Sequence, residues 1–286
     1  MNNETLLGAL NPIALHLGPL QVHWYGVIIT SGVFLALWLS LREARHQGLD
    51  PDDLYDFLLW ALPVALITAR LYYVVFQWDY YQHHLDQIIA IWDGGIAIYG
   101  ALIGAMIVVV WFTRARQIPT FLFLDVLAPT VIMAQGIGRW GNFMNQEAYG
   151  KITTHAHLEA LHLPAFIVNQ MNIDGAYRTP TFLYESVWDL AGFVLLMSTR
   201  HIKGLYRRGE VFFLYVCWYA FGRFFVEGMR TDSLMLGPAR VSQWLSVILF
   251  IGALTWLIIR RRQGVPMYVT DSELTTQGDK PGKENS

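Results

Sequence analysis

The chain has 286 residues, of which 54% are hydrophobic and 15% are charged, and its formal net charge at pH 7 is −2. An ordinary soluble domain has roughly 25% charged residues, so this composition argues against a water-soluble protein and predicts a membrane protein. The near-neutral charge gives no reason to expect a nucleic-acid partner. The single cysteine, Cys217, excludes an intramolecular disulfide.

Seven segments are long and apolar enough to cross a bilayer, which takes about 20 residues for roughly 30 Å of hydrocarbon. Three of them carry no Asp, Glu, Lys or Arg: residues 22–41, 94–113 and 241–259. Four more are interrupted by one or two charged residues: 54–76, 121–138, 182–199 and 211–226. The fold class we expect is therefore all-α, a polytopic membrane protein with seven transmembrane helices.

The remaining segments predict how the chain is organised around these helices. Residues 1–21 lack the basic region and the small-residue cleavage site of a signal peptide, and we expect them to lie on the membrane surface. The long polar connection 141–180 predicts a small cap over the helices. No repeat or linker divides residues 1–262, which we expect to form one transmembrane domain, and the polar segment 263–286 predicts a disordered tail.

The distribution of basic residues predicts the orientation, because cytoplasmic connections carry an excess of Lys and Arg. With the N-terminus outside, 13 of the 20 basic residues fall on the cytoplasmic side: Arg42, Arg45, Arg114, Arg116, Arg200, Lys203, Arg207, Arg208, Arg260, Arg261, Arg262, Lys280 and Lys283. The sequence therefore predicts an external N-terminus, a cytoplasmic C-terminus and an extracytoplasmic cap.

Several polar side chains fall near the outer ends of the expected helices. Arg70, Arg139 and Arg223 do so, and Tyr25 and Tyr99 lie in the first two turns of their helices on the same side. A charged group inside a bilayer usually faces a partner or a cavity, because its exposure to lipid tails is costly. We expect a functional site at the level of the outer leaflet.

One face of the sixth expected helix is polar. Tyr219, Arg223, Glu227 and Arg230 follow one another at i, i+4, i+8 and i+11, which places them within about 40° around the helix axis. Such a stripe is compatible with an ion-paired helix end that holds the bundle together, or with a site for an anionic ligand.

The arginine count favours the anionic ligand. Arg139, Arg223 and Arg230 outnumber Glu147 and Glu227, so an anionic headgroup would balance the remaining positive charge. Arginine suits this task, because its planar guanidinium stays charged and binds two phosphate oxygens at once.

Glycines recur in two of the expected helices. Gly136, Gly138 and Gly141 form a literal GxGxxG pattern, but an apolar helix instead of a strand precedes it, so we reject a nucleotide site. We expect these glycines to allow close packing of helices or close approach of the backbone to a ligand, and we expect Gly94, Gly95, Gly100 and Gly104 to serve packing similarly.

Five motifs of this sequence resemble one known family. The segment GRWGNFMNQEAYG at 138–150 is similar to the signature of the prolipoprotein diacylglyceryl transferase family. Further matches are HWYG at 23–26, WDGG at 92–95, Pro180 with LYE at 183–185, and the R-x-x-x-E pattern of Arg223 and Glu227. The resemblance covers residues 15–262 and agrees with the predicted membrane topology.

The resemblance implies a bacterial plasma-membrane enzyme. Members transfer the diacylglyceryl group of phosphatidylglycerol to the lipobox cysteine of prolipoproteins, forming a thioether and releasing glycerol phosphate. The implied partners are therefore phosphatidylglycerol and prolipoprotein signal peptides, and we expect no cofactor and no metal. Cys217 is then a packing residue, because the attacking sulfur belongs to the second substrate.

The resemblance also implies roles for individual residues. We assign catalytic roles to Arg139, Arg223, Tyr99 and Tyr25, with the arginines on the phosphate and Tyr99 taking the proton, assisted by Tyr25 or Glu227. The substrate-binding set we expect is Arg139, Asn142, Asn145, Glu147, Gly150, Glu227 and Arg230. Some members have histidine where Tyr99 lies, and a phenol with an ordinary pKa of about 10 is a poor base at neutral pH unless nearby cations assist.

The main alternative is a lipid or ion transporter with an outward-facing arginine cluster, since intramembrane charges also mark transport pathways. A scaffold that binds lipid without chemistry is a further alternative. The absence of a visible repeat and the position of the charges at one end of the helices favour the enzyme.

Overall fold

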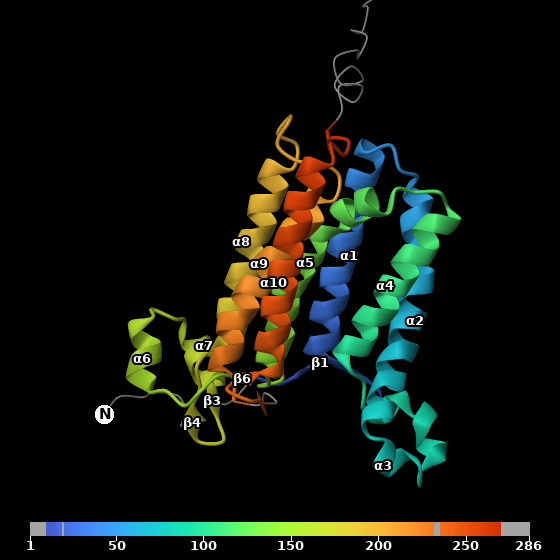
Figure 1. Cartoon of the computed structure of the whole chain (residues 1–286). Coiled ribbons are helices and arrows are strands. Elements are labelled where there is room, and N and C mark those ends of the chain that lie inside the picture. Colours follow the sequence, from blue (N-terminus) through green and yellow to red (C-terminus); the bar gives the residue numbers. More distant parts are fainter. Residues whose placement is uncertain (1–9, 19, 232–234, 270–286) are drawn as a thin grey trace, which may run out of the picture. The chain divides into compact units, whose positions relative to one another are not determined.

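A computed structural model describes residues 10–18, 20–231 and 235–269, and these are predominantly helical (Figure 1). The seven long helices are α1 (Trp24–His46), α2 (Pro51–Phe76), α4 (Ile98–Ala115), α5 (Thr120–Met144), α8 (Thr181–Thr199), α9 (Glu210–Met229) and α10 (Val241–Arg262). The all-α polytopic class is thus confirmed.

Six of these helices are long and apolar enough to cross a membrane: α1, α2, α4, α5, α9 and α10. Helix α8 forms where the sequence predicted a span, but it is not in this group and carries Glu185 and Asp189 on its buried side. Its assignment as a seventh span stays a prediction.

Short elements connect the long helices. They are α3 (Trp78–Tyr81), η1 (Leu85–Ile89), η2 (Ile91–Asp93), α6 (His155–Ala160), α7 (Ala165–Gln170) and the antiparallel pairs β1/β2 (Ile13–Leu17, Leu20–His23), β3/β4 (Asn172–Ile173, Ala176–Tyr177) and β5/β6 (Met235–Leu236, Ala239–Arg240). The described part of the N-terminal segment is thus the β1/β2 hairpin. Residues 1–9 and 19 of that segment, and 270–286 of the predicted tail, lie outside the described residues.

The chain divides into two compact units. The first unit contains the described residues up to Leu39 and from Asp125 onward, and the second unit is Ser40–Leu124. Each unit is described separately below. The single transmembrane domain over residues 1–262 stays a prediction.

The connection 141–180 is a folded region that shares an apolar core with the ends of α5 and α8, and its position as a cap stays a prediction. Helices α6 and α7 and the β3/β4 pair lie between α5 and α8 in the chain (Figure 1). The core residues, each less than a tenth exposed, are Phe143, Leu158, Ile167, Val168, Met171, Ile173 and Phe182. Because Phe143 belongs to α5 and Phe182 to α8, this core fixes the ends of both helices.

In the second unit, glycines let α4 approach α2. A Cβ atom at Gly104 would lie 3.0 Å from Cβ of Thr68, and one at Gly100 would lie 2.6 Å from Cβ of Tyr72. Real Cβ contacts are longer than this, so neither position can hold a side chain without moving α2. The predicted packing role of Gly100 and Gly104 is confirmed.

In the first unit, the GxGxxG glycines serve two different helix contacts. A Cβ at Gly141 would lie 2.9 Å from the Tyr25 ring of α1, whereas a Cβ at Gly136 would lie 3.2 Å from Cβ of Asp189 in α8. Helix α5 therefore packs α1 on one face and α8 on another. This confirms that the pattern serves helix packing.

Asp125, the charged residue inside the predicted span 121–138, caps another helix. Asp125 is fully buried, and its carboxylate accepts hydrogen bonds from the backbone N–H groups of Gly209 and Phe212, the latter at 2.9 Å. These N–H groups belong to the start of α9 and have no partner within that helix. Asp125 thus joins α5 to the first turn of α9.

Candidate functional site

Four charged side chains from α5, α8 and α9 meet in the first unit. Arg139 Nε forms an ion pair with Glu185 Oε2, and Arg223 Nη1 lies 2.7 Å from Glu185 Oε1. Arg223 Nη2 lies 2.6 Å from Oε2 of Glu227, one turn further along α9. We call Arg139, Glu185, Arg223 and Glu227 the arginine–glutamate cluster.

The carboxylates of this cluster are buried more deeply than the guanidinium groups. The side chains of Glu185 and Glu227 are 8% and 3% exposed, whereas those of Arg139 and Arg223 are 20% and 17% exposed. The Nε atom of Arg139 forms the ion-pair contact with Glu185, and no hydrogen bond to its two Nη atoms is found within the described part of the chain. The planar end of Arg139 is therefore available to two oxygens of an anion.

Glu185 is the partner that the charge count in the sequence overlooked. With Glu185 and Glu227 opposite Arg139 and Arg223, the cluster has no surplus of positive charge. An anion would therefore bind through the planar end of Arg139 and not through net charge. The signal was present in the sequence, because Glu185 interrupts an apolar helix and a membrane carboxylate normally has a cationic partner.

Asp189 was also missed as a member of the site. It follows Glu185 by one turn of α8, is 3% exposed, and its Oδ2 atom has no hydrogen-bond partner among the described residues. It lines a small cavity together with Glu185 and Arg223. Asp189 adds a buried carboxyl group next to the cluster.

Residues of the 138–150 motif lie at the end of α5. The Asn142 Nδ2 atom donates a hydrogen bond to Glu147 Oε1 at 2.9 Å, and the Glu147 backbone N–H donates to the Asn142 carbonyl at 3.0 Å. The Tyr25 ring of α1 lies against Gly141 in the same stretch of α5. Asn145 is exposed immediately after the helix ends. Tyr25, Arg139, Asn142 and Glu147 therefore share one end of the α1–α5 pair.

Gly150 and Arg230 lie side by side. They form an isolated antiparallel bridge, and the Gly150 N–H donates to the Thr179 carbonyl at 3.0 Å. A Cβ at Gly150 would lie only 2.8 Å from Cβ of Thr179. Gly150 thus allows close approach of another segment of this chain. Arg230 is the residue after α9 ends, with extended backbone angles, so it does not continue the helical stripe that the sequence predicted.

In the second unit, buried Arg70 holds the connection between α2 and α4. Its guanidinium donates to the carbonyl groups of Gln87, Ile88, Gly94 and Gly95 at 2.6–2.8 Å. These carbonyls belong to the segment that includes the WDGG motif. Arg70 is therefore satisfied by backbone oxygens and organises this segment.

Tyr99 lies in this second unit, as the second residue of α4. Its ring centroid is 6.4 Å from that of Tyr72. Of the predicted catalytic residues, the structure thus brings Arg139 and Arg223 together, with Tyr25 in the same unit. Tyr99 belongs to the other unit.

These features define the class: a polytopic α-helical membrane protein with a cluster of paired arginines and glutamates between its helices. The family model described as prolipoprotein diacylglyceryl transferase matches residues 12–259. The chain belongs to this family and is accordingly a membrane-bound transferase.

Relatives of high identity support the assignment, and the three that follow are each named phosphatidylglycerol--prolipoprotein diacylglyceryl transferase. The protein of Pediococcus pentosaceus is 65% identical over 272 residues, covering 94% of this chain and 98% of its own. That of Lactiplantibacillus plantarum is 66% identical, covering 90% of this chain and 92% of its own. That of Listeria innocua is 54% identical, covering 93% and 95%.

Proposed function

We propose that this protein transfers the diacylglyceryl group of phosphatidylglycerol to the thiol of the lipobox cysteine of prolipoproteins. The names of the relatives give the two substrates. The observation that carries the proposal is the arginine–glutamate cluster, because Glu185 holds Arg139 while the Arg139 side chain stays partly exposed to an anion.

The chemistry makes one bond and breaks one. The cysteine sulfur loses its proton and attacks the carbon of the diacylglyceryl group that bears the phosphate ester. The carbon–oxygen bond to the phosphate breaks as the carbon–sulfur bond forms, and the phosphate oxygen keeps the electron pair. The products are a thioether on the prolipoprotein and glycerol phosphate. The two demands on the enzyme are removal of a proton from a thiol with an ordinary pKa of about 8.5 and stabilisation of the departing phosphate.

The arginines meet the second demand. Arg139 would bind two phosphate oxygens with its Nη atoms, and Arg223 would add a second cation beside it. Glu185 contacts both arginines, so it fixes the direction of each guanidinium before the lipid binds. Such preorganised donors stabilise charge that develops in the transition state.

The motif residues at the end of α5 suit the glycerol headgroup. The Asn142–Glu147 pair offers a carboxylate oxygen and an amide to hydroxyl groups. Asn145 is exposed beside this pair, and Tyr25 contacts the same end of α5 at Gly141. Glu227 holds Arg223, while Gly150 and Arg230 support the wall of the site through their bridge.

We assign proton removal to Tyr99, with Tyr25 as its assistant. Both lie in the first turn of a long apolar helix, Tyr25 within the HWYG motif and Tyr99 shortly after the WDGG motif. A Phe substitution at each position removes the hydroxyl group while leaving the ring, so it tests this role directly.

We further propose that the protein lies in the bacterial plasma membrane with its N-terminus outside and its C-terminus in the cytoplasm. The basic residues of the predicted cytoplasmic connections support this orientation, which would place the 141–180 cap and the arginine–glutamate cluster outside. Reporter fusions at His162 and after Arg262 should be active in opposite compartments. The reverse pattern would overturn the orientation.

The activity is tested by mass. Purified protein in detergent, supplied with phosphatidylglycerol and a lipobox peptide, should add a diacylglyceryl group to the peptide. Arg139→Ala should reduce turnover at least about a hundredfold, as expected for loss of an electrostatic contact in the transition state. Arg116→Ala is the matched control, because Arg116 forms exposed ion pairs with Asp53 and Asp56. Lipid binding without any mass gain would support a scaffold instead, and equal turnover in the two variants would remove Arg139 from the mechanism.

A further inference from the structure

Helix α5 ends at the Asn142–Glu147 pair in a common type of turn that contains an uncommon residue. The Gln146 N–H donates to the Phe143 carbonyl at 3.2 Å, and the Glu147 N–H donates to the Asn142 carbonyl at 3.0 Å. These two bonds define a Schellman motif, in which the residue at the position of Gln146 takes left-handed backbone angles and is usually glycine. Here it is a glutamine with a φ of 51°.

A second left-handed residue follows Glu147. Ala148 has a φ of 58°, so Glu147 lies between two residues whose Cβ atoms disfavour this conformation. Residues other than glycine stay in this region only where surrounding contacts hold them. The contacts that hold Gln146 and Ala148 therefore determine where Glu147 points.

Gln146 is held by α7. Its Nε2 atom donates to the backbone carbonyl of Gln170 at 2.8 Å. Gln170 is only 1% exposed, and its own side chain donates to the Phe143 carbonyl at 3.0 Å and accepts from the Leu10 N–H at 2.7 Å. The first anchor of the turn is thus a buried residue with both ends of its amide engaged.

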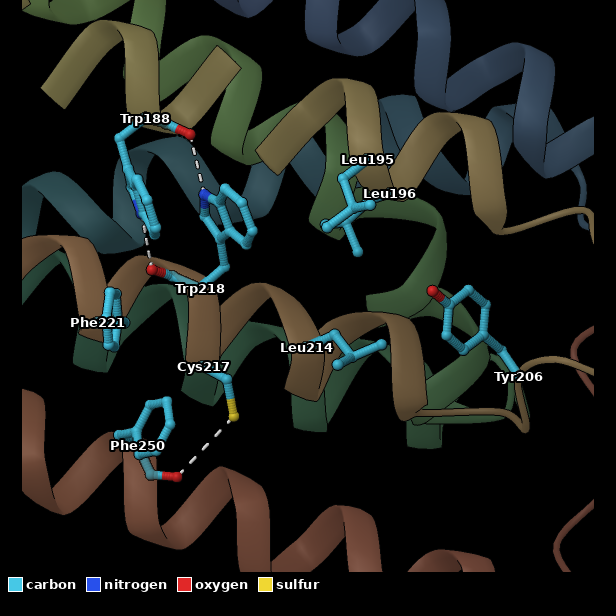
Figure 2. Close-up of a pocket in the computed structure, with 9 residues that line it drawn as sticks. All are labelled: Trp188, Leu195, Leu196, Tyr206, Leu214, Cys217, Trp218, Phe221 and Phe250. Carbon is cyan, nitrogen blue, oxygen red and sulfur yellow. Dashed lines mark hydrogen bonds between the residues drawn. The ribbon is translucent and has the colours of Figure 1, made fainter. Parts of the chain in front are cut away.

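Ala148 is held by α8. The hydroxyl of Thr181, a residue that is 1% exposed, donates to the Ala148 carbonyl at 2.6 Å. Thr181 is the first residue of α8, and this helix is joined to α9 by the stacked rings of Trp188 and Trp218. Each indole N–H donates to the backbone carbonyl of the other tryptophan at 2.9 Å (Figure 2). The second anchor therefore belongs to a helix that is itself fixed to its neighbour.

The turn gives Glu147 a polar partner where an apolar one is usual. In a Schellman motif the side chains at the positions of Asn142 and Glu147 frequently make a hydrophobic contact. In this chain they form a hydrogen bond of 2.9 Å, and Glu147 is exposed. Asn142 follows Arg139 by three residues, which places the two on one face of α5. The turn thus presents an amide and a carboxylate beside the arginine.

On the basis of the proposed function, we propose that Gln146 and Thr181 are positioning residues for the lipid substrate. They hold the two left-handed residues beside Glu147 and so direct the Asn142–Glu147 pair toward the glycerol headgroup of phosphatidylglycerol. Both act through the backbone next to Glu147. Because the pair binds the headgroup in the ground state and in the transition state alike, its misdirection should change KM and not kcat.

Two substitutions of Thr181 test the hydroxyl. Thr181→Val removes the donor to Ala148 and should raise KM for phosphatidylglycerol about fivefold with kcat within about twofold, which corresponds to the loss of one neutral hydrogen bond. Thr181→Ser keeps the hydroxyl and should restore the wild-type KM. Equal KM values in the two variants, or a loss confined to kcat, would overturn the role of Thr181.

Two substitutions of Gln146 test the backbone conformation. Gln146→Ala removes the amide and keeps a Cβ atom, so it should raise KM by a similar factor, whereas Gln146→Gly should stay near the wild-type KM because glycine adopts these angles without a steric cost. Asp174→Ala is the matched control and should leave KM unchanged, since Asp174 also has a positive φ, 52°, in the exposed turn between β3 and β4. An equal rise with alanine and glycine would mean that the Gln146 amide itself contacts the lipid, which contradicts a role through the backbone.

Diacylglyceryl transfer by the wild-type protein separates this proposal from the proposed function. If the wild-type protein is active and both Thr181→Val and Gln146→Ala share its KM, only the positioning roles are wrong. Absence of transfer by the wild-type protein would overturn the function and the positioning roles with it.

Discussion

Glu185 Oε1 accepts a charge-assisted contact from Arg223 Nη1 at 2.7 Å, while the other oxygen of the same carboxylate is paired with Arg139. One buried acidic residue of α8 thus holds two arginines from two other helices. Removing one partner of a buried ion pair is costly, because the remaining charge is left without compensation.

Glu185→Gln should therefore impair catalysis through the arginines. We expect kcat/KM to fall at least about tenfold, since misdirected guanidinium groups no longer match the departing phosphate. The measurement is diacylglyceryl transfer to a lipobox peptide, with kcat and KM determined separately. Glu159→Gln is the control, because Glu159 is an exposed residue of α6 whose Oε2 atom lies 3.4 Å from His155 Nδ1. Activity equal to that of the control would mean that Glu185 serves only to join helices.

Tyr99→Phe tests the assignment of the proton acceptor. If the hydroxyl removes the thiol proton, kcat should fall by about two to four orders of magnitude, the usual contribution of general acid–base catalysis. Tyr72→Phe is a matched control, because its ring neighbours that of Tyr99 in the same unit. Near-normal rates for Tyr99→Phe would move the role to another group, and Tyr25→Phe should then be measured.

Gly104→Val should destabilise the second unit. The added side chain would overlap Thr68 of α2, and overpacking of this kind costs about 1–3 kcal/mol. Thermal unfolding in detergent should show a lower Tm by several degrees. Gly252→Ala, where no atom lies within 4 Å of the added Cβ, should leave Tm unchanged or raise it slightly. Equal Tm values for the two variants would contradict the close α2–α4 packing.

Arg70→Gln should loosen the connection between α2 and α4. The change removes donors from four backbone carbonyls, and each hydrogen bond to a charged group contributes about 1.5–3 kcal/mol. Hydrogen–deuterium exchange should speed up in peptides covering residues 85–97. Arg114→Gln, at an exposed position of α4, should leave that exchange unchanged. Unaltered exchange in Arg70→Gln would show that the connection is held by other contacts.

Much of this protein could be predicted from its sequence. The apolar runs set the positions of the long helices, because a bilayer demands helices of a fixed minimum length. The spacing of Gly100 and Gly104, one turn apart, indicated a helix contact before its partner was known. The i, i+4 spacing of Arg223 and Glu227 likewise placed them on one helix face, and the structure pairs them at 2.6 Å.

Only the tertiary structure decided which residues pair across helices. Nothing local to Glu185 specifies that it joins Arg139 and Arg223, which lie 46 and 38 positions away in the chain. The same holds for Asp125, whose partner N–H groups begin a distant helix. Helix periodicity determines which side chains are neighbours on one helix. Contacts between helices depend on the angles at which the helices pack and on the position of each residue along its helix relative to the next, and these are set only when the chain folds.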